Sequence, residues 1–208
     1  HRLLQRDLTG GKIEQDEFDR LMQAQRKRAK GASPIEQSIF MTSEFDKRLH
    51  ELPATKFLGY DTHQGKGKVL LAQVEQDKGI IVLDQTTFYG ESGGQVGDQG
   101  VLKADGFEAQ VEDTQKKDSY HLHYVRILKG KVKEGTQVEA VIDSKRRDSA
   151  MRNHTATHLL HAVLREILGK QVRQVGSLVH PDRLRFDYSF SRPLAEEELL
   201  KIESRVNE

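Results

Sequence analysis

Seven short segments in which apolar and polar residues alternate constrain the fold most, and they follow one another between Lys56 and Ile142. The segments are KFLGYD, KVLLAQVEQ, GIIVLDQ, VLKA, FEAQVEDTQ, YHLHYVRIL and QVEAVI. A period of two is typical of β-strands with one buried face. Glycine and Lys-Gly turns separate the segments, and no helical pattern interrupts them. This region therefore predicts a small β-barrel or sandwich.

Helical patterns precede this region. Residues 13–30 have an apolar face surrounded by charges and end in the basic run Arg26–Lys30. That run fits favourable charge at a helix C-terminus, and contact with RNA phosphates is the alternative. Residues 33–36, Ser-Pro-Ile-Glu, form a capping box. We expect a second helix from there to about Leu49, ended by Pro53.

After the predicted strands the pattern changes again. A long helix is expected from Asp143 to Leu168, with Gly169 at its C-terminal end. A pair of strands is expected over residues 172–180 and 183–190, and a helix follows over residues 193–208.

The predicted fold class is therefore α+β, in three parts. Residues 1–52 form a helical segment, residues 53–142 a β-barrel-like domain, and residues 143–208 an α+β domain. The chain does not begin with Met, and its last helical pattern has no stop signal. We therefore expect a fragment of a longer protein.

Composition excludes several classes. The chain has no cysteine, which excludes a disulfide scaffold, a cysteine zinc finger and a thiol nucleophile. It has no apolar run long enough to span a membrane and no signal peptide. Lys and Arg number 33 and Asp and Glu 32, so the net charge of +1 disfavours a bulk polyanion binder but permits local basic patches. We expect a cytoplasmic protein without membrane or DNA partners.

Histidines share one face of the predicted helix within residues 152–169, RNHTATHLLHAVLREILG. If His154 is set to zero around the helix axis, His158 lies at about 40° and His161 at about −20°, because an α-helix has 3.6 residues per turn. Two histidines at i and i+4 form a metal-binding pair on a helix. A zinc protease motif also needs Glu after the first histidine, where this chain has Thr155.

The pair alone does not establish a metal site. The alternative is two surface or interfacial histidines on an amphipathic helix. A closed zinc site needs about four ligands. Without cysteine, the remaining ligands must come from His180, His121, His123, carboxylates, or sequence beyond Glu208.

A second segment, TFYGESGGQVGDQG, crowds five glycines into residues 90–100. Its spacing fits neither GxGxxG nor a phosphate loop, so it is no evidence for a nucleotide site. One interpretation is an elaborate hairpin loop. The other is a backbone wall that admits a ligand closely.

Two smaller groups remain. His121 and His123 alternate along one predicted strand, and we interpret them as half-exposed structural residues. Lys145, Arg147 and Arg152, together with Arg146, precede the histidine face on the long helix. They would meet a phosphate-bearing ligand entering the cleft, and a solvated helix start is the alternative.

Together these segments resemble the alanyl-tRNA synthetase family. TFYGESGGQVGDQG is similar to the family's glycine-rich motif, and RNHTATHLLH to the start of its editing-site helix. QVGSLVHPDRLRFDYSF continues the similarity, and EFDRLMQAQRKRAK resembles the helical stretch before the editing domain. The resemblance covers about Asp16 to the C-terminus.

The resemblance implies an editing domain that hydrolyses tRNA(Ala) mischarged with serine or glycine, with an α+β part similar to that of threonyl-tRNA synthetase. It implies a zinc ion with His154 and His158 as ligands, and a Cys and a His downstream of Glu208 as the others. Gln174 matches a residue implicated in editing, and Thr157 lies beside the site, so the resemblance implies that both are catalytic residues.

The resemblance also points to residues that contact the substrate or tRNA: Gly93, Gly94, Gln95, Arg147 and Arg152. ATP and magnesium would serve only the aminoacylation site of the full-length enzyme, outside this chain. We expect an incompletely ligated zinc site and an inactive isolated fragment. A free-standing editing hydrolase and a non-catalytic tRNA-binding module are the alternatives.

Overall fold

The computed structural model describes residues 40–208, so the helix expected over residues 13–30 and the capping box at 33–36 lie outside the described residues. The chain divides between Asp46 and Lys47 into two compact units. Helix α3 (Ser43–His50) starts just after Thr42, whose hydroxyl accepts a hydrogen bond from the amide of Phe45 at 3.1 Å. It ends before Pro53, as expected.

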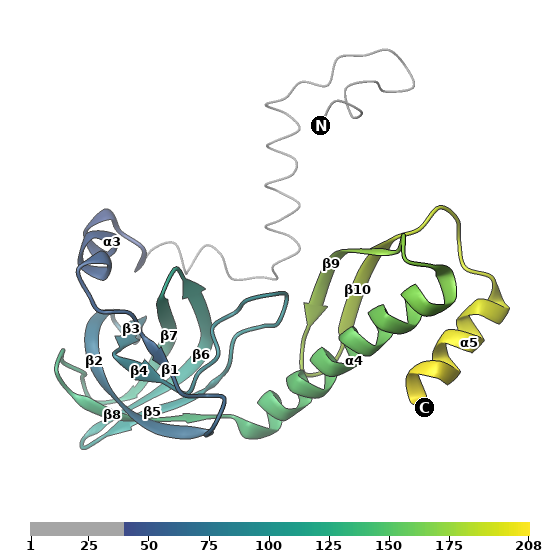
Figure 1. Ribbon diagram of the computed structural model, residues 1–208. Coiled ribbons are helices and arrows are strands. Elements are labelled where there is room, and N and C mark those ends of the chain that lie inside the picture. The colour runs from purple at the N-terminus through teal and green to yellow at the C-terminus, as the bar shows by residue number, and fades with distance from the viewer. Residues whose placement is uncertain (1–39) are drawn as a thin grey trace, which may run out of the picture. The chain divides into compact units, whose positions relative to one another are not determined.

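Six strands close into an antiparallel barrel, in the order β2-β3-β7-β6-β5-β8 (Figure 1). Their bounds are β2 (Gln64–Glu75), β3 (Lys78–Leu83), β5 (Gly100–Ala104), β6 (Phe107–Lys117), β7 (Tyr120–Lys129) and β8 (Gln137–Ile142). Each coincides with one of the segments of alternating polarity. The barrel interpretation is therefore confirmed over the sandwich.

The long strand β2 closes the barrel because it pairs with two neighbours. Its first half, residues 64–68, pairs with β8, and its second half, residues 69–75, pairs with β3. The register shifts between Val69 and Leu71, where one partner replaces the other. Such an irregularity bends a strand and increases its twist, which closure requires.

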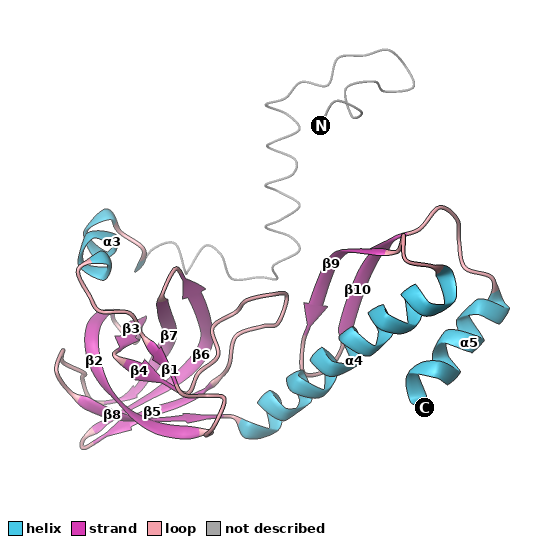
Figure 2. Ribbon diagram, viewed as in Figure 1, coloured by secondary structure: helices cyan, strands magenta, loops and turns pink. Residues whose placement is uncertain are grey.

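The first predicted strand contributes little to the sheet. KFLGYD forms only β1 (Lys56–Phe57), which pairs in parallel with β4 (Gln85–Thr86) in a separate two-stranded sheet (both are labelled in Figure 2). Its last three residues, 59–61, form a turn instead.

One apolar cluster fills the barrel, because the alternating residues of each strand point to the same side. Its buried members are Val69, Ile81, Leu83, Phe88, Leu102, Phe107, Ala109, Val111, Val125, Val138, Ala140 and Ile142. The phenyl ring of Phe88 comes from the segment after β4 rather than from a barrel strand, so this segment is anchored in the core.

Helix α4 (Ser144–Leu168) follows the barrel directly. The Asp143 carboxylate accepts from the amide of Arg146 at 3.1 Å and caps the N-terminus. Gly169 is the C-cap, and its amide donates to the carbonyl of Arg165. Both ends agree with the sequence prediction to within one residue.

An antiparallel pair, β9 (Arg173–Val179) and β10 (Leu184–Ser189), lies along α4, followed by α5 (Glu196–Asn207), which packs on the same helix (Figure 1). Their shared core is small. Its buried members are Val163, Leu164, Leu168, Val172 and Ile202. The fold is therefore α+β, as predicted, whereas the similarity to the threonyl-tRNA synthetase editing domain stays a prediction.

Helix α5 is tied to its surroundings by charges. The Arg192 guanidinium donates two hydrogen bonds of 2.7 Å to Glu198 and lowers the pKa of that carboxyl to about 2. Arg205 pairs with Glu166 on α4 at 3.1 Å. Among residues 40–208, no helix combines the length and hydrophobicity needed to cross a membrane.

Candidate functional site

The glycine-rich segment is a loop closed at its base by one carboxylate. The amide of Tyr89 donates to Asp98 Oδ2 at 2.9 Å, and the amide of Asp98 donates to the carbonyl of Tyr89 at the same distance. Thr114 on β6 donates its hydroxyl to the carbonyl of Asp98. Residues 90–97 therefore project from the barrel as a loop whose two ends are held together.

Arg147 joins this loop base to α4. Its guanidinium pairs with the Asp98 carboxylate and donates to the carbonyls of Gly59 and Thr87 at 2.8 and 2.9 Å. Its side chain is only 5% exposed. The rings of Phe57 and Tyr89 each lie 5.9 Å from the guanidinium carbon.

Arg147 was predicted to contact the substrate or tRNA, but this geometry corrects that expectation. Its guanidinium is enclosed by the barrel, the loop and α4, so it cannot reach a phosphate at the surface. The sequence did not reveal this role because an arginine in the first turns of a helix ordinarily projects into solvent. Asp98, its acidic partner, carried no signal beyond lying in the glycine-rich segment.

The tip of the loop pairs with the edge of β9. The amide of Val96 donates to the carbonyl of Val179 at 3.1 Å, and the amide of Val179 donates to the carbonyl of Gly94 at 2.7 Å. The loop thus supplies a short parallel bridge to β9. Gly94 has φ of +86°, and a Cβ there would lie 2.5 Å from Ser177 Oγ. Only glycine permits this approach.

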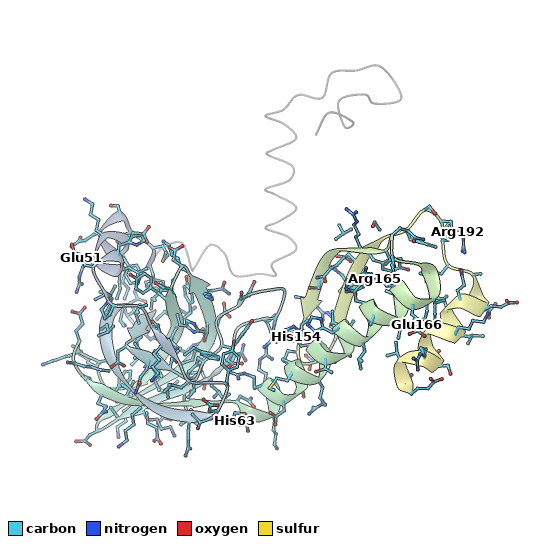
Figure 3. All side chains as sticks on the ribbon, in the orientation of Figure 1. Glu51, His63, His154, Arg165, Glu166 and Arg192 are labelled. Atoms are coloured by element: carbon cyan, nitrogen blue, oxygen red, sulfur yellow. The ribbon has the colours of Figure 1, made fainter. Side chains whose placement is uncertain are left out.

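His154 and His158 lie side by side on α4, as the helical spacing predicted (Figure 3 labels His154). Their rings stack with centroids 4.9 Å apart and an interplanar angle of 21°. His154 is half-buried and His158 exposed. Partial burial, and then the neighbouring His158 ring, lowers the pKa of His154. The ring of His154 is therefore favoured in the neutral form that binds metals.

Gln95 connects the loop to this pair. Its side chain is buried, and its Oε1 lies 2.7 Å from Nδ1 of His154. Gln95 was predicted as a substrate contact from the resemblance. The structure places its carboxamide against a ring nitrogen of His154, and the substrate contact stays a prediction. Sequence spacing does not reveal the contact with His154, because the loop and the helix are 59 residues apart.

Two imidazoles fit part of a zinc site. Nitrogen ligands suit zinc, and a ligating histidine usually bonds a carbonyl or carboxylate through its other nitrogen, as His154 bonds Gln95. A closed site takes about four ligands. Within residues 40–208, no group of three or more histidines or carboxylates is arranged to hold a metal. The donors in this part of the chain therefore account for at most two ligands.

The two residues predicted as catalytic lie in different environments. Thr157 is buried on α4 and donates its hydroxyl to the carbonyl of Asn153 at 2.8 Å. Gln174 is exposed on β9 and donates its amide to Ser177 Oγ at 3.1 Å. Ser177 in turn borders Gly94, so Gln174 is connected through one residue to the loop.

The other predicted contacts are at the surface. Gly93, with φ of +60°, is exposed at the loop tip, and no atom lies within 4 Å of the position that a Cβ would take there. Arg152 is exposed on α4 and donates to Ser149 Oγ at 2.8 Å. Both can meet a ligand, unlike Arg147.

Hydrogen bonds between α4 and the β9–β10 turn form a clamp that the sequence does not predict. Asn153 donates its amide to the carbonyls of His180 and Pro181, at 2.7 and 3.1 Å. The Arg146 guanidinium lies 3.4 Å from Nε2 of His180. Burial, and then the charge of Arg146, lowers the pKa of His180. Asn153 adjoins His154 in the sequence, so the clamp fixes the same turn of α4 that carries the pair.

The expectation that His121 and His123 are half-exposed is wrong. Both are buried, because the segment around Phe88 and the β1–β4 pair cover this part of β7. His123 bonds the carbonyl of Ile81 at 2.9 Å and the hydroxyl of Thr86 at 2.8 Å. Burial lowers the pKa of His123 to about 3. These histidines are structural and lie apart from the pair on α4.

The fold and site define a protein in which a barrel loop meets a two-histidine helix, and comparison with known proteins identifies its class. The family model of class II (A) tRNA synthetases matches residues 6–146. This chain belongs to that family.

Its relatives are alanine–tRNA ligases. The chain is 42% identical to the enzyme of Pseudothermotoga lettingae over 95% of its own length, and 42% identical to that of Thermus thermophilus over 94%. Identity to the Mesorhizobium japonicum enzyme is 46% over 74% of the chain. The chain spans only 23%, 23% and 19% of these relatives' lengths. The predicted resemblance is confirmed.

Proposed function

We propose that this chain is part of the editing region of an alanine–tRNA ligase, and that it helps to hydrolyse the ester joining serine or glycine to tRNA(Ala). The observation that carries the proposal is the stacked pair His154 and His158, placed on α4 where the glycine-rich loop meets the helix. The relatives' names support the ligase, which would attach alanine to tRNA with ATP and magnesium at a site outside this chain, in the cytoplasm.

The chemistry explains why such a ligase needs a second site. A pocket that accepts alanine cannot strongly exclude glycine, which is smaller, or serine, which adds only a hydroxyl. Binding differences of this kind give discrimination of about 10²-fold, too little for protein synthesis. Hydrolysis at a separate site removes the errors that the first site admits.

In this proposal His154 and His158 supply two nitrogen ligands to zinc. Bound zinc is a Lewis acid that polarises a carbonyl, activates water or holds the amino acid. Gln95 holds the ring of His154, and Gln174 offers a carboxamide at the exposed edge of β9. Arg152 and Lys145 are exposed cations on the same helix and suit the phosphates of the tRNA.

Deacylation of Ser-tRNA(Ala) by the full-length ligase tests the proposal. We expect H154A to lower the deacylation rate by roughly 100-fold or more, because loss of a ligand should cost at least as much as loss of a residue that only orients a ligand, which costs about 10–100-fold. Gln174→Ala should act in the same direction. Alanine charging should stay near its wild-type rate, and H63A, an exposed histidine beside the barrel, is the matched control. Equal loss of editing and charging in H154A would contradict the proposal.

The 208-residue chain alone separates the remaining alternatives. We expect it to deacylate far more slowly than the full-length ligase, because two ligands are half of a closed zinc site. A rate equal to that of the ligase would favour a free-standing hydrolase. A full-length protein that binds tRNA but leaves the ester intact would favour a non-catalytic binding module.

A further inference from the structure

Gln95 places a hydrogen-bond acceptor against one specific nitrogen of His154. The residue is 4% exposed, and its Oε1 lies 2.7 Å from Nδ1 of the imidazole. A carboxamide oxygen can only accept a hydrogen bond, so the ring must donate. A neutral imidazole carries one proton, and with that proton on Nδ1 the other nitrogen, Nε2, keeps its lone pair.

We propose that Gln95 is a positioning residue, which fixes His154 in the Nδ1–H tautomer and so presents the lone pair of Nε2 as a ligand. The metal in this statement rests on the proposed editing function, whereas the tautomer is a property of the chain itself. The role differs from the substrate contact that the sequence resemblance suggested for Gln95.

The backbone around Gln95 is organised to hold its carboxamide in place. The amide of Gln95 donates to the carbonyl of Ser92 at 3.0 Å, and the amide of Ser92 donates back at 3.2 Å. The next residue, Val96, bonds Val179 on β9. The Gln95 side chain is therefore held between a tight turn and a strand edge, and little conformational entropy is lost when it orients the imidazole.

The same arrangement recurs as a general feature of metal sites. Ligating histidines usually donate their second ring N–H to a carbonyl, carboxylate or water, and this fixes the tautomer and the ring orientation. Loss of such a partner typically costs about 10–100-fold in metal affinity or activity. Gln95 should have an effect of this size although it touches no metal.

NMR of the 208-residue chain labelled with ¹⁵N-histidine tests the tautomer directly. Spectra are recorded at about pH 8, where imidazoles are neutral. In the wild type, His154 should show a protonated Nδ1 and an unprotonated Nε2, with H154Q providing the assignment. Gln95→Met removes the acceptor at nearly constant volume and should move the proton largely to Nε2. Gln95→Glu keeps an acceptor and should retain the Nδ1–H tautomer.

Gln99→Met is the matched control, because the amide of Gln99 bonds the carbonyl of Glu112 at 2.7 Å and no histidine. It should leave the His154 tautomer unchanged. Unchanged signals of buried His123 show that each variant is folded. A wild-type His154 protonated at Nε2, or a folded Q95M variant that keeps the Nδ1–H form, overturns the proposal.

Zinc titration of the same samples gives a second readout. Q95M should weaken the zinc-induced shifts at His154 by about 10-fold or more in apparent Kd, whereas Q99M should not. The two proposals fail separately. A full-length ligase without editing activity, combined with the expected tautomer, overturns the function and leaves the positioning role. Editing activity combined with an Nε2–H tautomer of His154 overturns the positioning role and leaves the proposed function.

Discussion

The β-barrel and the α+β part of the chain reach their folded state in different ways. Each barrel strand pairs on both sides, and the barrel's exposed apolar residues, Val74 and Leu128, each lie one residue from a strand end. In the α+β part the sheet has two strands, and Val175, Leu199 and Leu200 are 73%, 51% and 60% exposed. The barrel strands therefore satisfy one another's edges, whereas the smaller part leaves apolar side chains exposed.

This difference explains where the candidate site lies. A two-stranded sheet is marginal alone and has free edges. The barrel loop covers one of these edges at Gly94–Val96, and the same loop carries Gln95 to His154. Contacts with the well-packed barrel therefore stabilise the α+β part, which bears the histidines. The next three predictions test the connection and the contrast between the two regions, from the largest expected effect to the smallest.

Arg147→Met breaks the connection between the two regions. It leaves the Asp98 carboxylate without its charged partner and the carbonyls of Gly59 and Thr87 without the guanidinium donor. Removal of one partner of a buried pair costs about 3–5 kcal/mol. We expect the free energy of unfolding in urea to fall by about that amount. Arg152→Met, on the exposed side of the same helix, should change it by less than about 0.5 kcal/mol. Equal effects would show that Arg147 does not join the regions.

Leucine truncations compare the regions directly. Leu102 is fully buried in the barrel, and Leu200 is 60% exposed on α5. Leu102→Ala should lower the free energy of unfolding by about 2–5 kcal/mol, because it leaves a cavity. Leu200→Ala should cost less than about 0.5 kcal/mol. Comparable losses in urea denaturation would mean that Leu200 is covered in solution and that the contrast between the regions is smaller than the structure indicates.

Acid should destabilise the barrel through His123. Its pKa is about 3 when folded, because burial disfavours the charged ring, and about 6.5 when unfolded. The unfolded state therefore binds the extra proton as the pH falls below about 6.5. Stability is fully present above that pH and is lost progressively down to about pH 3. This histidine should lower the free energy of unfolding by about 2 kcal/mol between about pH 6.5 and 5.

The variant His123→Gln isolates this contribution. It should reduce the pH dependence between about pH 6.5 and 5, whatever its stability at neutral pH. Parallel slopes for H123Q and the wild type, measured by urea denaturation at each pH, would show that His123 is not buried in neutral form.

Local patterns in the sequence predicted most of the fold. Alternation identified the barrel strands, the helical period and Asp143 located α4, and Gly169 marked its end. The i, i+4 spacing also placed His154 and His158 on one face. These features depend on residues near one another in the chain. The predicted boundaries at residues 52 and 142 remain an interpretation, because residues 47–208 form one compact unit.

The errors concern residues whose partners are distant in sequence. Arg147 looked like a surface cation, but its partner Asp98 is 49 residues away. His123 looked half-exposed on an alternating strand, but Phe88 and Thr86 cover it. For Gln95 the sequence did not reveal the contact with His154, which is 59 residues away. In each case the environment of the side chain depends on a segment far away in the sequence. The residue pattern along one strand or one helix carries no information about that segment.

By itself, the sequence determined the barrel strands, the histidine pair and the membership of a tRNA synthetase family, because hydrophobic period, helical spacing and motif are local properties. Only the tertiary structure decided that Arg147 is enclosed, that β9 gains an edge partner from the loop, and that Gln95 is the residue behind His154. The physical reason is that closing the barrel brings the loop, α4 and β9 together. Which side chains are buried or hydrogen-bonded then depends on the contacts among these three segments and not on any one of them.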